Sequence, residues 1–175
     1  MTLEINFKKY IEEIELIDAQ NRVESDLYSI IAYIIRASKQ GVNISLRDVS
    51  TRRGTEFSKR FIGDSGFPDF VIRAREMSND AKVLGAIEVK YVTEDLDLEK
   101  HLEQLSGHIN SYKQVIYTNG LVWRFYKLDK YKKDEQPVWE FRLAEERKGR
   151  IEWGGGDEWN KLLKKLDDID WIGQK

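Results

Sequence analysis

The feature that most restricts the fold is a continuous apolar run, residues 83–87 (VLGAI), followed directly by Glu88, Val89 and Lys90. An uninterrupted apolar run of this length predicts a strand that is covered on both faces. Side chains alternate across a strand, so Glu88 and Lys90 share one face. Removing two charges from water costs several kcal/mol unless they are paired, bind a metal or line a polar cleft. The presence of this charge pair in a buried strand therefore needs an explanation.

A second strand is predicted just before this one. Residues 67–75 (FPDFVIRAR) open at Pro68, which a strand tolerates at its first position, and the short polar segment 76–81 leads into the apolar run. Two strands joined in this way predict an antiparallel hairpin. Asp69, at the start of one strand, then lies near the end of the other, and directly opposed residues point to the same face. A slip of one residue would turn Asp69 to the other face, and the sequence leaves that register open.

Two carboxylates and a lysine that converge in a cleft have a chemical use. Mg²⁺ or Mn²⁺ prefers oxygen ligands, keeps several waters and needs only one or two carboxylates together with substrate phosphate. Such an ion polarises a phosphate and lowers the pKa of a bound water. Lys90 would hold or deprotonate that water, or stabilise negative charge in the transition state. Asp69, Glu88 and Lys90 are therefore candidate catalytic residues, with the two acids as candidate metal ligands.

The remaining elements follow from hydrophobic periodicity and turn residues. Helices are expected over 4–19, 22–39 (with Gly41 placed to end it), 93–112 and 157–166, and further strands over 42–46, 114–118, 121–128 and 138–143. Helices and strands mix without strict alternation, which predicts an α/β fold with a mixed central β-sheet flanked by helices. Residues 50–66 are expected to form a long polar loop.

Composition limits the functional classes. The 175 residues, 41% apolar and 34% charged, suit one globular domain over 1–175. No apolar stretch is long enough to cross a membrane and the first residues do not form a signal peptide, so a cytoplasmic location is expected. The absence of cysteine excludes disulfides, thiolate catalysis and cysteine-based zinc sites.

Any contact with nucleic acid must be local, because the formal net charge is −2. Arg52, Arg53, Lys59 and Arg60 precede Asp69 closely in the chain, so their loop could border the cleft and hold DNA phosphates. Solvation of an exposed loop explains such charges equally well.

Residues 66–69 (GFPD) together with 88–90 (EVK) resemble the motif of the PD-(D/E)xK nuclease superfamily, which includes restriction endonucleases and related DNA-processing enzymes. Residues 116–126 (IYTNGLVWRFY) are similar to a segment in nuclease domains of Type I and related ATP-dependent restriction enzymes. The resemblance covers about residues 22–127 as a core and leaves 128–175 as an extension. It implies a restriction-endonuclease-like sandwich and Mg²⁺- or Mn²⁺-dependent hydrolysis of DNA phosphodiester bonds.

The resemblance also implies roles for residues outside the central motif. Glu24, on a helix ahead of the strands, matches an acid that would touch a second metal or a metal-bound water; a helix-cap or helix-dipole role is the alternative. Gln104 matches the glutamine of a Gln-x-x-x-Tyr motif and would orient the site or the DNA backbone. The fifth position holds His108 instead of Tyr, and this histidine is expected to be a helix-surface or packing residue and not a general base. The carbonyl of Val89 would be a third metal ligand.

Three functions stay open from sequence. The first is a metal-dependent endonuclease, which the intact acids and lysine favour. The second is a non-catalytic nuclease-fold module that binds DNA or protein, and the third is an enzyme on the same scaffold that acts on RNA or a small molecule. In the restriction branch a nuclease domain works beside translocase or target-recognition parts. The expected partners are therefore DNA and a homodimer or a larger restriction complex.

Overall fold

A six-stranded sheet organises the computed structural model, which describes residues 5–51, 58–129 and 136–173. The strands lie in sequence order: β1 (Ile44–Asp48), β2 (Phe70–Ala74), β3 (Val83–Val89), β4 (Gln114–Thr118), β5 (Val122–Lys127) and β6 (Trp139–Arg142). Neighbours run antiparallel except β3 and β4, which are parallel because a helical crossover joins them. The predicted mixed central sheet is therefore confirmed.

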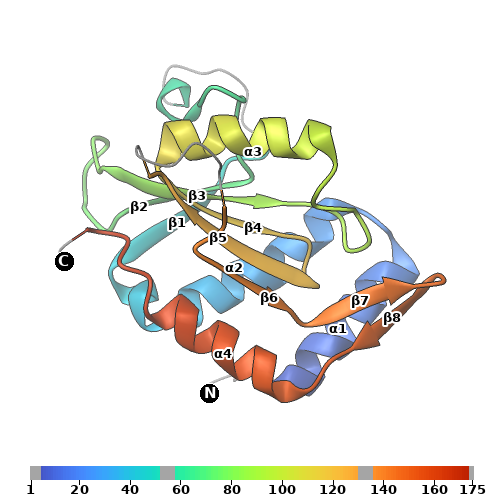
Figure 1. Ribbon diagram of the computed structural model, residues 1–175. Helices are drawn as coiled ribbons and strands as arrows, with labels where there is room; N and C mark the ends of the chain where they lie inside the picture. The colour runs from blue at the N-terminus through green and yellow to red at the C-terminus, as the bar shows by residue number, and fades with distance from the viewer. Residues whose placement is uncertain (1–4, 52–57, 130–135, 174–175) are drawn as a thin grey trace.

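Helices cover both faces of the sheet (Figure 1). Helix α3 (Glu99–Tyr112) lies on one face, and α1 (Phe7–Gln20), α2 (Tyr28–Ala37) and α4 (Gly156–Asp167) lie on the other. Helix α1 begins after Asn6, whose side chain accepts a hydrogen bond of 3.0 Å from the backbone N–H of Lys9. The predicted α/β fold with helices on both sides of the sheet is confirmed. Among the described residues, no helix has the length and apolar character needed to span a membrane.

The central strand is buried as its apolar run predicts. Every residue of β3 from Leu84 to Val89 is buried, so both faces are covered. Gly85 allows this packing: a Cβ there would lie 2.7 Å from Cζ3 of Trp171. Trp171 and Trp159 are themselves buried, so these tryptophans from the C-terminal extension belong to the core.

Two predicted helices begin later than the periodicity indicated. Residues Glu24–Leu27 form a short 3₁₀ turn, η1, before α2 begins. Helix α3 begins at Glu99 and not at residue 93, because Asp97 is held in the preceding loop by a bidentate ion pair with Arg124 of β5, at 2.6 and 3.0 Å. The acids expected in the first turn of this helix instead fix the loop that leads into it.

A second, two-stranded sheet was not predicted. Strands β7 (Ala144–Arg147) and β8 (Arg150–Trp153) pair antiparallel around Lys148 and Gly149. Both turn residues have positive φ, 53° and 77°, as a two-residue type I′ turn requires. The Lys-Gly pair was the available signal, but the flanking strands are mostly charged and lack the apolar alternation that marks a strand.

Gly41 does not end α2, which stops at Ala37, where Ser38 turns to extended backbone. Gly41 lies in the 3₁₀ turn η2 (Lys39–Val42), and a Cβ there would come within 2.1 Å of the Arg36 carbonyl oxygen. Since the backbone must move to admit a methyl group, we expect Gly41→Ala to lower the free energy of unfolding by about 1–3 kcal/mol in urea titrations. Gly156→Ala is the matched control, because its nearest neighbour is 3.8 Å away. Equal unfolding midpoints for the two variants would contradict this reading.

Candidate active site

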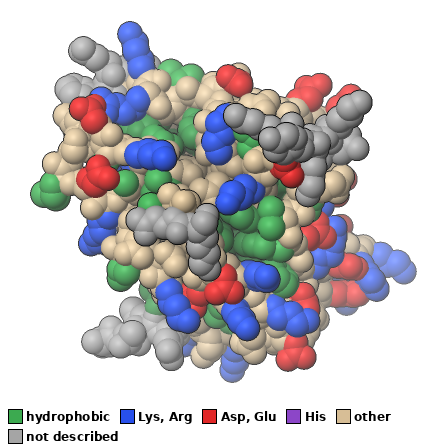
Figure 2. Space-filling view, turned by 60° about the vertical axis from the view of Figure 1, so that its left-hand side comes forward, with side chains coloured by type: hydrophobic (Ala, Val, Ile, Leu, Met, Phe, Trp, Pro, Cys, Tyr) green, Lys and Arg blue, Asp and Glu red, His purple; other side chains and the backbone are tan. Residues whose placement is uncertain are grey.

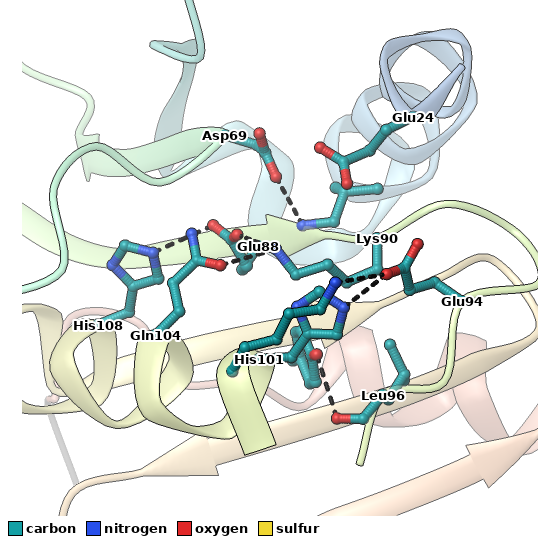
Figure 3. Close-up of polar contacts among 12 residues, drawn as sticks. Glu24, Asp69, Glu88, Lys90, Glu94, Leu96, His101, Gln104 and His108 are labelled. Atoms are coloured by element: carbon teal, nitrogen blue, oxygen red, sulfur yellow. Dashed lines mark hydrogen bonds and ion pairs between the residues drawn. The ribbon is translucent and has the colours of Figure 1, made fainter. Parts of the chain in front are cut away.

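Three charged side chains meet where β3 ends and β2 begins (Figure 3). Phe70 pairs with Ile87 in the β2–β3 hairpin, so extending this register by one residue places Asp69 opposite Glu88. This is the register that the hypothesis of converging acids requires. Asp69, Glu88 and Lys90 are 8%, 3% and 7% exposed, which places three ionisable groups out of bulk water within one small region.

Asp69 is held by two hydrogen bonds. Its Oδ2 accepts from the backbone N–H of Val89 at 2.7 Å, and its Oδ1 accepts from the hydroxyl of Tyr28. Burial and the negative charge of Glu88 raise the pKa of Asp69 to about 7, although both hydrogen bonds act in the opposite direction. The site therefore carries an acid that is costly to ionise when no cation is present.

Glu88 and Lys90 form a buried ion pair. The ammonium of Lys90 lies 2.6 Å from Oε1 of Glu88 and donates a second hydrogen bond of 2.9 Å to Oε1 of Gln104 on α3. Burial opposes ionisation of Glu88, but contact with His108 and the charge of Lys90 outweigh it, so the pKa of Glu88 is lowered. The two acids thus differ: Glu88 is kept charged, whereas Asp69 resists ionisation.

Glu24 lies at the edge of this site, at the first residue of η1. Its Oε1 is 3.3 Å from the hydroxyl of Tyr28, which also contacts Asp69. Burial raises the pKa of Glu24, while the charge of Lys90 lowers it and that of Glu88 raises it. Tyr28 therefore links two acids of the site. Tyr28 was not predicted from the sequence as a site residue, although it lies four residues after Glu24, a spacing that places two side chains on the same face of a helix.

His108 is fully buried beside Glu88, so a helix-surface role for it is wrong. Its Nε2 lies 3.2 Å from Oε2 of Glu88. Together with Gln104, one turn earlier on α3, it forms the wall of the site on the helix side (Figure 3). The Gln-x-x-x-His spacing therefore brings both side chains to the same charged pair.

The predicted DNA-binding residues are only partly described. Arg52 and Arg53 lie outside the described residues. Lys59 and Arg60 lie on the short turn η3 (Lys59–Phe61), where Arg60 lies 3.3 Å from Oδ1 of Asp80 in the β2–β3 connection. On the face drawn in Figure 2, basic side chains are mixed with acidic ones around a hydrophobic area and do not form one continuous basic track.

The donor set at this site fits a hard divalent cation. Across residues 5–51, 58–129 and 136–173, no three His, Asp or Glu side chains are gathered as a ready-made metal cluster. Mg²⁺ and Mn²⁺ need fewer protein ligands than that, and two carboxylates with one carbonyl leave room for water and phosphate. The buried Oε2 of Glu88 has no well-formed hydrogen bond, and repulsion between Asp69 and Glu88 is what a cation would relieve. Asp69, Glu88 and the carbonyl of Val89 could therefore hold such an ion.

Comparison with known proteins gives a relationship in fold. No protein-family model and no curated protein sequence matches the chain. It is similar to a chain in the cryo-EM structure of a DrdV–DNA complex, with a TM-score of 0.57 and 16% sequence identity. The likeness establishes a shared fold. The match covers 93% of this chain but 14% of that chain, so this protein corresponds in length to a small part of its structural neighbour.

Proposed function

We propose that this protein is a metal-dependent endonuclease that hydrolyses phosphodiester bonds in DNA. The observation that carries the proposal is the convergence of Asp69, Glu88 and Lys90, buried together at the end of β3. Three such charges are expensive to bury, and chemistry on a charged substrate gives them a purpose. The fold shared with part of a protein seen in complex with DNA supports DNA as the substrate.

Asp69, Glu88 and the Val89 carbonyl would hold Mg²⁺ or Mn²⁺. In an extended strand the N–H and C=O of one residue point to the same side, and the N–H of Val89 points to Asp69. The Val89 carbonyl is therefore directed toward the side from which Asp69 approaches. When bound, the ion would polarise the scissile phosphate and lower the pKa of a coordinated water.

Lys90 would act on the charge that develops at the phosphate. Its ammonium lies between Oε1 of Glu88 and Oε1 of Gln104, at 2.6 and 2.9 Å, so its position is fixed from two sides. An ammonium held in this way can orient the attacking water and stabilise negative charge in the transition state. Gln104 positions Lys90, and Glu24, joined to Asp69 through Tyr28, would contact a metal-bound water or a second ion.

DNA binding and targeting require parts beyond this site. Lys59 and Arg60 are the proposed phosphate contacts, together with Arg52 and Arg53, which lie outside the described residues. Cutting both strands of a duplex requires two such centres. We therefore propose that the protein works as a homodimer or within a larger restriction complex that supplies target recognition or translocation.

Cleavage of supercoiled plasmid tests the proposal. We expect nicking or linearisation with Mn²⁺ or Mg²⁺, its loss in EDTA, and a fall of on the order of 10²-fold or more in Glu88→Gln, because a charged ligand is removed. Glu12→Gln, which changes an exposed acid of α1 paired with Lys8, is the matched control for the loss of a carboxylate elsewhere and should cleave like the wild type. Cleavage that persists in Glu88→Gln would contradict the assignment of this site.

A non-catalytic nuclease-fold module is the second candidate. The observation that favours it is that both oxygens of Asp69 and one oxygen of Glu88 have protein hydrogen-bond partners. Calorimetric titration with Mn²⁺ separates the two candidates. Binding that is lost in Asp69→Ala supports the nuclease, whereas no binding to the wild-type protein would leave a module that binds DNA or protein.

A further inference from the structure

The contact between α3 and Glu88 contains an unusual group of atoms. Over the described parts of the chain, three buried side-chain polar atoms have no well-formed hydrogen bond: Oε2 of Glu88 and both ring nitrogens of His108. Two of them meet at one contact, since Nε2 of His108 is 3.2 Å from Oε2 of Glu88. That distance is within hydrogen-bond range, although the two atoms do not form a well-formed bond. A buried group of unsatisfied atoms beside candidate metal ligands needs a functional explanation.

The surroundings of His108 favour one tautomer of the ring, because the two tautomers leave different buried groups without a hydrogen-bond partner. A neutral imidazole carries one N–H and one bare nitrogen. With the proton on Nε2, the N–H lies beside the carboxylate of Glu88, and the bare Nδ1 leaves no buried donor without an acceptor. The ring of Tyr112 packs near the His108 ring, at 5.8 Å between centroids. The opposite tautomer would set a lone pair against the carboxylate and leave a buried N–H without an acceptor.

Lys90 and His108 hold the Glu88 carboxylate from two sides. Lys90 reaches Oε1 at 2.6 Å, and His108 stands at Oε2 at 3.2 Å. The carboxylate is almost completely buried, so these two side chains and the strand itself fix its orientation. Lys90 supplies the positive charge that compensates the carboxylate, and His108 fixes the orientation of its second oxygen.

We propose that His108 is a positioning residue for the proposed metal site, in which its Nε2–H donates to Oε2 of Glu88 and fixes the carboxylate without itself binding the metal. This inference rests on the proposed nuclease function and adds to it a residue at a position where the resembled motif has tyrosine. Partners that orient ligating carboxylates contribute to metal affinity, and their loss costs roughly 10–100-fold.

Ring nitrogen NMR of the metal-free wild-type protein tests the position of the proton directly. The chain has two histidines, and His101 hydrogen-bonds to Glu94 at 2.8 Å and not to Glu88. A His101→Gln variant therefore assigns the two signals. We expect the His108 ring to carry a proton on Nε2. A bare Nε2 would overturn the proposal.

Mn²⁺ titration calorimetry tests the positioning role. We expect His108→Ala to bind Mn²⁺ about 10–100-fold more weakly than the wild type. In His108→Gln the amide N–H can still donate to Glu88, so this variant should recover most of that loss. His101→Gln should bind Mn²⁺ like the wild type. Wild-type affinity in His108→Ala would overturn this inference and leave the proposed function intact. Electron spin-echo spectra of bound Mn²⁺ give a separate check: a nitrogen coupling lost in His108→Gln would make His108 a ligand, contrary to the proposal. If the wild-type protein binds no Mn²⁺, the proposed function and the positioning role both fail.

Discussion

Lys90→Ala is expected to lower the rate of metal-dependent plasmid cleavage by on the order of 10²–10³-fold, the loss typical of removing one preorganised charge from a transition state. Lys90 is not a proposed metal ligand, so Mn²⁺ should still bind. Its ammonium lies 2.6 Å from Glu88 and 2.9 Å from Gln104, so its position in the site is fixed by both contacts. Single-turnover cleavage rates at saturating Mn²⁺ measure the effect.

Folding must be separated from catalysis in this variant. Removing one partner of a buried ion pair leaves the other charge uncompensated and typically costs about 3–5 kcal/mol. Lys90→Arg keeps the charge and is expected to be more stable than Lys90→Ala. Its planar guanidinium is larger than an ammonium and cannot take the same place between the two oxygens, so this variant should also lose most of the cleavage rate. Lys161→Ala, an exposed lysine of α4, is the control for a general loss of positive charge. Near-wild-type cleavage in folded Lys90→Arg would show that any cation at this position suffices.

The central strand and its charged end could be predicted because one continuous sequence pattern, an apolar run followed by two charged residues, defines both. An apolar run that ends in Glu88 and Lys90 is incompatible with an exposed strand, and the preceding Pro68-Asp69 has a natural place at the start of the paired strand. The β2–β3 pairing has the register that this reading needs. Sequence patterns alone do not fix a register to one residue, so the structure was required for that step.

Residues that complete the site were harder to predict because their partners are distant in sequence. Tyr28 contacts Asp69 across 41 positions, and its place on the apolar stripe of α2 indicates only core packing. His108 lies next to Glu88 only because the crossover through α3 folds back over β3. The start of α3 was misplaced for the same reason, since Arg124 on a later strand captures Asp97. Periodicity describes contacts within an element, whereas these contacts join separate elements.

Asp69→Asn is expected to make the metal-free protein more stable at pH 8 while abolishing cleavage. The pKa of Asp69 is raised from 3.8 to about 7, so folding favours its protonated form. The stability that this provides is present below pH 4 and is lost as the pH rises through about 7. An uncharged amide avoids that loss, and the shift corresponds to a gain of up to about 4 kcal/mol at pH 8, with little change at pH 4.

Urea unfolding in EDTA at both pH values measures this gain, with exposed Asp64→Asn as the matched control. Metal dependence gives the second half of the prediction. Mn²⁺ should raise the melting temperature of the wild-type protein more at pH 8 than at pH 5, because the ion relieves repulsion that exists only when both Asp69 and Glu88 are charged. Asp69→Asn should show little stabilisation by Mn²⁺ at either pH. Equal stability of Asp69→Asn and the wild type at pH 8, with equal stabilisation by Mn²⁺, would mean that Asp69 is held by Tyr28 and Val89 for structural reasons and does not serve a cation.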